Sequence, residues 1–221
     1  MKINPYIDHT LLKATATKTQ IISLCEEAKM YNFYAVCVNG CYVALAKNQL
    51  ENSKVKVAAV IGFPLGAMTT ETKVFEAKNC IDKGASEIDM VINIGKLIDG
   101  DFTYVENEIK QIKEAIWGNT LKVIFENCYL TKTQIKKACE LAVNAGADFV
   151  KTSTGFGTSG ATFEDVQLMK ETVNNKAQIK AAGGVRDMAT AQKYIEMGVT
   201  RLGTSSGVAL VKTGISNKNE Y

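Results

Sequence analysis

The sequence has little of what metal and disulfide chemistry require. It contains a single histidine, His9, and none of its six cysteines forms a Cys-x-x-Cys pair. A zinc site usually needs two or three imidazoles or clustered thiolates, so a metal-dependent enzyme is not expected. Most of the cysteines fall within apolar helical or strand patterns, which favours buried free thiols over disulfides.

A signal core and a membrane-spanning stretch are also missing. Met1 to Thr10 has no apolar core, and the longest apolar run, Val57 to Met68, is interrupted by glycine and proline. The net charge is only +3, and the lysines are scattered rather than gathered into blocks. We therefore expect a cytoplasmic protein that binds a small molecule and neither nucleic acid nor a membrane.

Proline is scarce as well, with two residues in 221, and no Ser/Pro-rich linker divides the chain. A hydrophobic content of 46% is ordinary for a globular protein. We expect one catalytic domain over residues 1–221, ending in a short polar tail from about residue 215 to residue 221.

Short β-branched runs alternate with amphipathic helical stretches along the whole chain. Two of these stretches begin with a capping box, Thr17-x-x-Gln20 and Thr131-x-x-Gln134. The eight predicted strands are Tyr6–His9, Phe33–Val38, Val55–Ile61, Glu87–Ile92, Leu121–Glu126, Phe149–Ser153, Gln178–Ala182 and Arg201–Thr204. Repeated βα units indicate a parallel sheet, and eight of them predict an α/β fold closed into a single (β/α)₈ TIM barrel. A doubly wound open sheet is the alternative, but its Gly-x-Gly-x-x-Gly turn after the first strand is missing.

Several residues that end helices share one spacing to the strand that follows. Gly84, Gly146 and Gly198 fit the left-handed position after a helix, and Asn175 is of the other residue type that tolerates it. Counting five residues onward from these four positions reaches Asp89, Lys151, Gly203 and Lys180. If the turns are alike, these residues lie at similar depth, and a barrel active site takes its groups from the ends of several strands.

Lys151 and Lys180 each stand within an apolar strand. Alternation along the strand directs Lys151 into the barrel or into the helix layer, and an ordinary position beyond the strand end is the competing interpretation. Two inward lysines on neighbouring strands would repel each other. Burial and a nearby ammonium both lower the pKa of a lysine, which a nucleophilic amine requires at neutral pH.

Asp89 is the third candidate catalytic residue, because it stands within another apolar strand. Its carboxylate would exchange protons or simply pair with a lysine, and both interpretations stay open. Asp8 and Glu126 are further inward acids with accessory roles.

Small residues follow the predicted seventh and eighth strands, where barrels commonly bind phosphate. Each turn alone is typical of an ordinary loop, but their joint position predicts a phosphate site. The predicted substrate-binding and phosphate-binding residues are Gly183, Gly184, Gly203, Ser205, Ser206 and Thr154.

These segments together closely resemble the deoxyribose-phosphate aldolases over nearly the whole chain. The resemblance is carried by Ile7–Leu12, Cys37–Asn39, Glu87–Val91, Lys122–Glu126, Asp148–Phe156, Lys180–Gly184 and Gly203–Gly207. It implies a class I aldolase that interconverts 2-deoxyribose 5-phosphate with acetaldehyde and glyceraldehyde 3-phosphate. By this resemblance Lys151 corresponds to the lysine that forms the Schiff base, and Lys180 to the lysine that tunes the reactivity of that amine. Asp89 corresponds to the acid that works through a water.

The resemblance also implies that the protonated iminium is the electron sink, so that no metal or other cofactor is needed. Some members end in a tail whose final tyrosine reaches the active site, and this chain ends in Tyr221. Barrels of this kind often form dimers or tetramers, so we expect a homo-oligomer. Two alternatives stay open: another Schiff-base aldolase of phosphorylated sugars, and a phosphosugar isomerase with Glu126 or Asp89 as its base.

Overall fold

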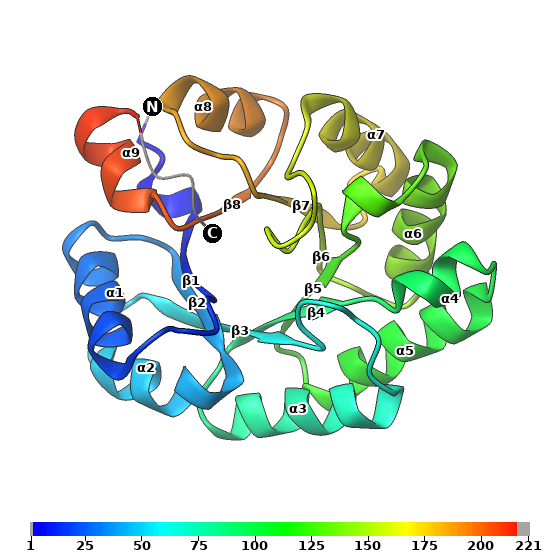
Figure 1. Cartoon of the computed structure of the whole chain (residues 1–221), viewed down its shortest axis with the longest axis horizontal. Helices are drawn as coiled ribbons and strands as arrows, with labels where there is room; N and C mark the ends of the chain where they lie inside the picture. Colours follow the sequence, from blue (N-terminus) through cyan, green and yellow to red (C-terminus); the bar gives the residue numbers. More distant parts are fainter. Residues whose placement is uncertain (1, 216–221) are drawn as a thin grey trace.

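The computed structural model describes residues 2–215, which form a closed barrel of parallel strands. Each strand pairs with the next in chain order, and β8 pairs with β1 (Figure 1). The strands are β1 (Ile7–Leu11), β2 (Ala35–Asn39), β3 (Lys56–Ile61), β4 (Glu87–Val91), β5 (Thr120–Ile124), β6 (Phe149–Lys151), β7 (Gln178–Ala182) and β8 (Arg201–Thr204). The predicted (β/α)₈ barrel is confirmed.

The helices form an outer layer around this sheet (Figure 1). They are α1 (Lys18–Met30), α2 (Val43–Gln49), α3 (Thr70–Asp82), α4 (Ile94–Ile98), α5 (Phe102–Ala115), α6 (Lys132–Asn144), α7 (Phe163–Val173), α8 (Met188–Glu196) and α9 (Gly207–Thr213). Short 3₁₀ turns cover Asn4–Tyr6, Gly40–Tyr42 and Asn127–Tyr129. Both predicted capping boxes are present, at the starts of α1 and α6. No helix within residues 2–215 is both long enough and apolar enough to span a membrane.

Two apolar clusters of unequal size form the core. The larger lies between the strands and the surrounding helices and takes alternate strand residues such as Val150, Ile179 and Leu202. The smaller contains Leu12, Cys37, Ala58 and Val60, which belong mainly to β2 and β3. Because successive strand residues face opposite sides, the residues between those of the outer cluster point into the barrel. On β4 to β8 many of these inward residues are charged.

The predicted spacing of the helix ends is confirmed by the backbone. Gly84, Gly146 and Gly198 have φ angles of 104°, 81° and 93°, and Asn175 has a φ of 62°. After Gly84 the N–H of Ala85 donates to the carbonyl of Cys80, and equivalent bonds follow Gly146 and Gly198. These three helices therefore enter their next strands through the same kind of turn.

Two predicted strands end two residues earlier than expected. β5 ends at Ile124 rather than Glu126, because Glu126 adopts a left-handed conformation with φ 57°. β6 ends at Lys151 rather than Ser153. The ladder gives way to loops at this end of the barrel, so Glu126 and Ser153 belong to the loops above the site.

Candidate active site

Seven charged side chains lie inside the barrel, and each is at least 96% buried. They are Asp8, Glu87, Asp89, Lys122, Lys151, Lys180 and Arg201. Buried charges are costly unless they are paired, so the contacts among these groups decide whether the site is stable and what it can do.

Asp89 on β4 is the centre of the group and contacts three lysines. Lys122 on β5 donates to its Oδ1 atom at 2.7 Å. Lys151 and Lys180, on β6 and β7, donate to its Oδ2 atom at 2.9 and 2.7 Å. The structure therefore brings together the three residues that the sequence predicted as catalytic, and directs Lys151 into the barrel.

A second set of contacts lies around Arg201 at the start of β8. Its Nε atom donates to Asp8 Oδ1 at 2.8 Å, and its Nη1 and Nη2 atoms donate to Glu87 at 3.1 and 2.7 Å. Asp8 also accepts a hydrogen bond from Lys180, and Glu87 lies 2.5 Å from Lys122 Nζ. The ring of Tyr34 stacks on the guanidinium at 3.6 Å.

These contacts fix the charge states of Asp89 and Lys180. Burial alone would raise the pKa of Asp89, but the charges of Lys122, Lys151 and Lys180 hold it well below its ordinary value. Burial alone would lower the pKa of Lys180, but Asp8 and Asp89 raise it above its ordinary value. Asp89 is therefore an anion and Lys180 a cation at neutral pH.

The pKa of Lys151 is shifted in the opposite direction from that of Lys180. Burial lowers the pKa of its amino group, Asp89 opposes this shift, and the Lys180 ammonium adds to it. Lys151 and Lys180 are in register on neighbouring strands, yet their pKa values are shifted in opposite directions. The arrangement favours a neutral amine at Lys151, which is the form that adds to a carbonyl carbon.

The sequence interpretation missed three members of the site: Glu87, Lys122 and Arg201. Lys122 lies between Leu121 and Val123, which face the outer core, so the period-two argument used for Lys151 would also have found it. Glu87 shares a strand face with Asp89 and could have been found in the same way. Arg201 opens a strand, where a long side chain usually reaches solvent, and only barrel closure places it beside Asp8.

Glu126 lies in the loop after β5 and binds the loop after β6. Its carboxylate accepts hydrogen bonds from the Thr154 N–H at 3.2 Å and from the Thr154 hydroxyl. The Thr154 hydroxyl also accepts a hydrogen bond from the N–H of Phe156. Burial raises the pKa of Glu126, although the bonds from Thr154 and the charge of Lys151 lower it. Both donors of Thr154 are therefore directed to Glu126.

The small-residue loops lie at the same end of the barrel. Gly183 and Gly184 follow β7 with φ angles of 80° and 79°, a conformation that a side chain would strain. A Cβ atom on Gly203 would lie 3.2 Å from Cε of Lys180, so glycine leaves room for the lysine stem. These residues thus border the Lys180 side of the site.

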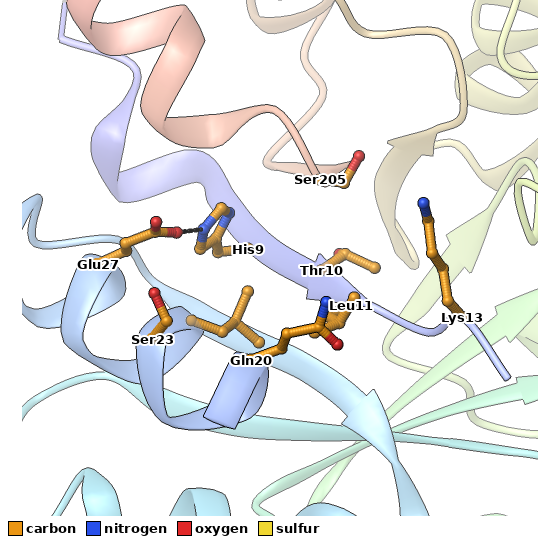
Figure 2. A pocket seen from close by; sticks show the side chains of 9 residues that line it. His9, Thr10, Leu11, Lys13, Gln20, Ser23, Glu27 and Ser205 are labelled. Atoms are coloured by element: carbon orange, nitrogen blue, oxygen red, sulfur yellow. Dashed lines mark hydrogen bonds and ion pairs between the residues drawn. The ribbon is translucent and has the colours of Figure 1, made fainter. Parts of the chain in front are cut away.

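Ser205 lines a surface hollow of about 340 Å³ beside the end of β1 (Figure 2). In this view Ser205 lies above Thr10, and the amino group of Lys13 stands to its right. His9 points toward α1, where its Nε2 atom lies 2.6 Å from Glu27. The N–H of Ser206 donates to the Thr204 hydroxyl at 3.0 Å, which shapes the turn into α9.

Within residues 2–215, no three His, Cys, Asp or Glu side chains gather in an arrangement that could hold a metal ion. The predicted accessory residue Tyr221 and the polar tail from residue 216 onward lie outside the described residues.

Comparison with known proteins gives consistent matches over nearly the whole chain. A family model described as DeoC/LacD family aldolase matches residues 3–213. A deoxyribose-phosphate aldolase from Finegoldia magna is 56% identical over 212 residues, covering 96% of this chain and 100% of that protein. One from Geobacillus sp. is 57% identical over 214 residues, covering 96% of each. A tetrameric deoxyribose phosphate aldolase from Aeropyrum pernix matches with a TM-score of 0.88 at 30% identity, covering 96% of this chain and 91% of that chain.

Proposed function

Because the chain belongs to the DeoC/LacD family of aldolases, we propose that it is a deoxyribose-phosphate aldolase whose nucleophile is Lys151. The reaction is the reversible cleavage of 2-deoxyribose 5-phosphate to acetaldehyde and glyceraldehyde 3-phosphate. The observation that carries the proposal is the buried Lys151 amine, which shares one carboxylate with a protonated Lys180. The names of the relatives support the choice of substrate.

In the direction of synthesis, the neutral amine of Lys151 adds to the carbonyl carbon of acetaldehyde. Loss of water gives a protonated iminium, which withdraws electrons from the neighbouring methyl carbon. That carbon loses a proton to form an enamine, and the enamine attacks the aldehyde carbon of glyceraldehyde 3-phosphate. Water then hydrolyses the new iminium and frees both the sugar phosphate and the lysine. Cleavage follows the same steps in reverse.

Lys180 and Asp89 support these steps through their charges. The Lys180 ammonium disfavours a second cation at Lys151 in the free enzyme, and Asp89 balances the positive charge of the iminium once it forms. Asp89 Oδ2 lies 2.9 Å from the reacting nitrogen of Lys151, and Lys180 Nζ lies 2.7 Å from the same oxygen. Both groups would therefore also exchange protons during carbinolamine formation.

The isomerase alternative has less support from this geometry. It requires Asp89 or Glu126 to act as a free carboxylate base on a sugar carbon. Asp89 accepts hydrogen bonds from three lysines, and Glu126 accepts hydrogen bonds from Thr154. Both carboxylates are thus already engaged by other groups of the protein, whereas a base for a sugar carbon must be free to reach that carbon.

The phosphate group of the substrate would bind at the loops after β7 and β8. Gly183, Gly184 and Gly203 stand at these two strand ends, and a Cβ atom at Gly184 would meet nothing within 4 Å, which leaves that backbone open to close approach. Ser205 and Ser206 carry hydroxyls beside the first turn of α9. A sugar bound with its phosphate here would extend its aldehyde end toward Lys151 on β6. Thr154 would contribute by shaping the neighbouring loop with Glu126.

The remaining expectations concern assembly and location. The tetrameric relative from Aeropyrum pernix supports a homo-oligomer for this chain, as a dimer or a tetramer. Light scattering coupled to size-exclusion chromatography would give the number of copies. The cytoplasmic location stays a prediction.

The proposed reaction is tested by incubating the protein with 2-deoxyribose 5-phosphate and measuring acetaldehyde and glyceraldehyde 3-phosphate. Equal amounts of both products should appear, while ribose 5-phosphate, which carries a hydroxyl at the carbon that becomes the enamine, should react far more slowly. Preference for ribose 5-phosphate, or release of an isomeric sugar phosphate, would contradict the proposal.

A further inference from the structure

The buried charges inside the barrel form a closed ring of alternating sign. In order, the ring runs through Asp89, Lys180, Asp8, Arg201, Glu87 and Lys122, and returns to Asp89. We call these six side chains the charge ring. Each member contacts a group of opposite charge on both sides, so three carboxylates and three cations balance one another.

Lys151 is attached to this ring but is not part of it. Within residues 2–215, Asp89 is the one carboxylate at ion-pair distance from its amino group, at 2.9 Å. Both oxygens of Asp89 already accept hydrogen bonds from ring members, Oδ1 from Lys122 and Oδ2 from Lys180. Lys151 is therefore the fourth cation in a site with three carboxylates.

We propose that the charge ring makes Lys151 the amine that gives up its proton, and that Lys122, Glu87 and Arg201 act through the ring as positioning residues for it. The inference rests on the proposed function, in which Lys151 is the nucleophile. In a site with little water, removing the unmatched positive charge is the least costly way to reach neutrality. The lowered pKa of Lys151 is consistent with this arrangement.

Two further titratable groups face Lys151 from other elements. Cys37 on β2 is buried, and burial raises the pKa of its thiol, so it stays neutral at neutral pH. Glu126, after β5, is held by Thr154. Substitutions at Lys122 and Glu87 leave both groups unaltered. The direction in which such substitutions move the pKa of Lys151 is therefore set by the charge ring and not by Cys37 or Glu126.

The ring predicts opposite effects for the loss of a ring cation and of a ring anion. Lys122→Met leaves three carboxylates with two ring cations, so the proton on Lys151 becomes the missing counter-charge and is bound more tightly. Glu87→Gln leaves two carboxylates with three ring cations, so the proton on Lys151 is bound more weakly. One nearby charge typically moves a pKa by about 1 to 3 units, and each unit changes the neutral fraction tenfold.

The experiment measures how fast Lys151 is trapped by acetaldehyde and borohydride as a function of pH, together with kcat/KM for 2-deoxyribose 5-phosphate. The trapping rate should rise with pH as Lys151 loses its proton. This rising part of the pH–rate profile, the rising limb, should move to higher pH in Lys122→Met and to lower pH in Glu87→Gln. At pH 7 the trapping rate of Lys122→Met should fall at least about tenfold and recover at alkaline pH. Lys122→Arg keeps the positive charge, so its rising limb should lie at the same pH as that of the wild type.

Lys73→Met is a matched control, because Lys73 is equally buried and pairs with Glu108 outside the barrel. It should lower stability without moving the limb. Limbs that stay in place, or that move in the same direction in Lys122→Met and Glu87→Gln, would overturn the role of the ring. If Lys122→Met does not fold, the shift of the rising limb to lower pH in Glu87→Gln tests the role of the ring by itself. Failure to trap any lysine in the wild type would instead overturn the proposed function.

Discussion

Lys151 and Asp89 lie 62 positions apart in the chain, yet the amino group of one lies 2.9 Å from a carboxylate oxygen of the other. They stand on β6 and β4, and β5 separates the two strands in the sheet. The contact is possible because both side chains point into the barrel, where Lys180 reaches the same oxygen from β7. One carboxylate oxygen thus accepts hydrogen bonds from two lysines whose pKa values are shifted in opposite directions.

Asp89→Asn should weaken both turnover and folding. The substitution leaves the lysines around a neutral amide, so the positive charge of the iminium is no longer balanced. We expect kcat to fall by about 10²- to 10⁴-fold, the usual contribution of a proton-transfer group. The free energy of unfolding should fall by about 3–5 kcal/mol, as for other broken buried ion pairs. Steady-state kinetics and urea denaturation measure the two effects, and a kcat near that of the wild type would contradict the role of Asp89.

Acid should destabilise the protein through the carboxylates of the site. Burial alone would raise the pKa of Asp8, but Arg201, Lys180 and Lys122 lower it below its ordinary value of 3.8. Below about pH 4 the unfolded chain therefore binds a proton that folded Asp8 does not, and stability falls as the pH decreases. The slope is about 1.4 kcal/mol per pH unit for each such carboxylate.

Asp8→Asn isolates this contribution. Its unfolding free energy should depend less steeply on pH between about pH 4 and pH 2, while its stability at pH 7 is lower because Arg201 and Lys180 lose a partner. Chemical denaturation across this range measures both quantities. Equal slopes for the variant and the wild type would show that folding does not lower the pKa of Asp8.

Ser205→Ala should affect the phosphorylated substrate selectively. A hydrogen bond to a charged group is worth about 1.5–3 kcal/mol, so KM for 2-deoxyribose 5-phosphate should rise about tenfold or more. Trapping of Lys151 by acetaldehyde, which has no phosphate, should keep the rate of the wild type. An equal loss with both compounds would mean that Ser205 supports the fold of the β8 to α9 loop and does not bind phosphate.

The buried pair of Lys73 and Glu108 should contribute to stability and not to chemistry. Lys73 donates to Glu108 at 2.8 Å and to the carbonyl of Val91 at 2.9 Å, and Glu108 accepts from the N–H of Asn93. Lys73→Met leaves a buried carboxylate without its cation and should cost about 3–5 kcal/mol. The double variant Lys73→Met with Glu108→Leu should recover part of that loss, which thermal unfolding would show. A double variant no more stable than the single one would contradict this account.

Much of the fold could be predicted from local patterns. Short β-branched runs located all eight strands, and the glycines at 84, 146 and 198 marked helix ends because few other residues accept a left-handed conformation. The ends of β5 and β6 were misplaced, since the left-handed Glu126 carries no local signal of its conformation. A glutamate with φ 57° is set by the Thr154 contacts of the folded loop, which sequence spacing does not reveal.

The candidate site was predicted in part. Lys151, Lys180 and Asp89 stood out because each is a charge in an apolar strand. Arg201 did not, because its partner Asp8 lies 193 positions away and meets it only when β8 closes on β1. The balance of charges that distinguishes Lys151 from Lys180 depends on this closure, so it is a property of the barrel and not of either strand.

The role of Lys151 as the nucleophile is tested most directly by mass spectrometry after borohydride reduction in the presence of acetaldehyde, with Lys151→Leu as the comparison. We expect one reduced adduct, located on Lys151 in the wild type and missing in the variant. An active, folded wild-type enzyme without an adduct would contradict the Schiff-base mechanism, and an adduct on Lys180 would reverse the roles assigned to the two lysines.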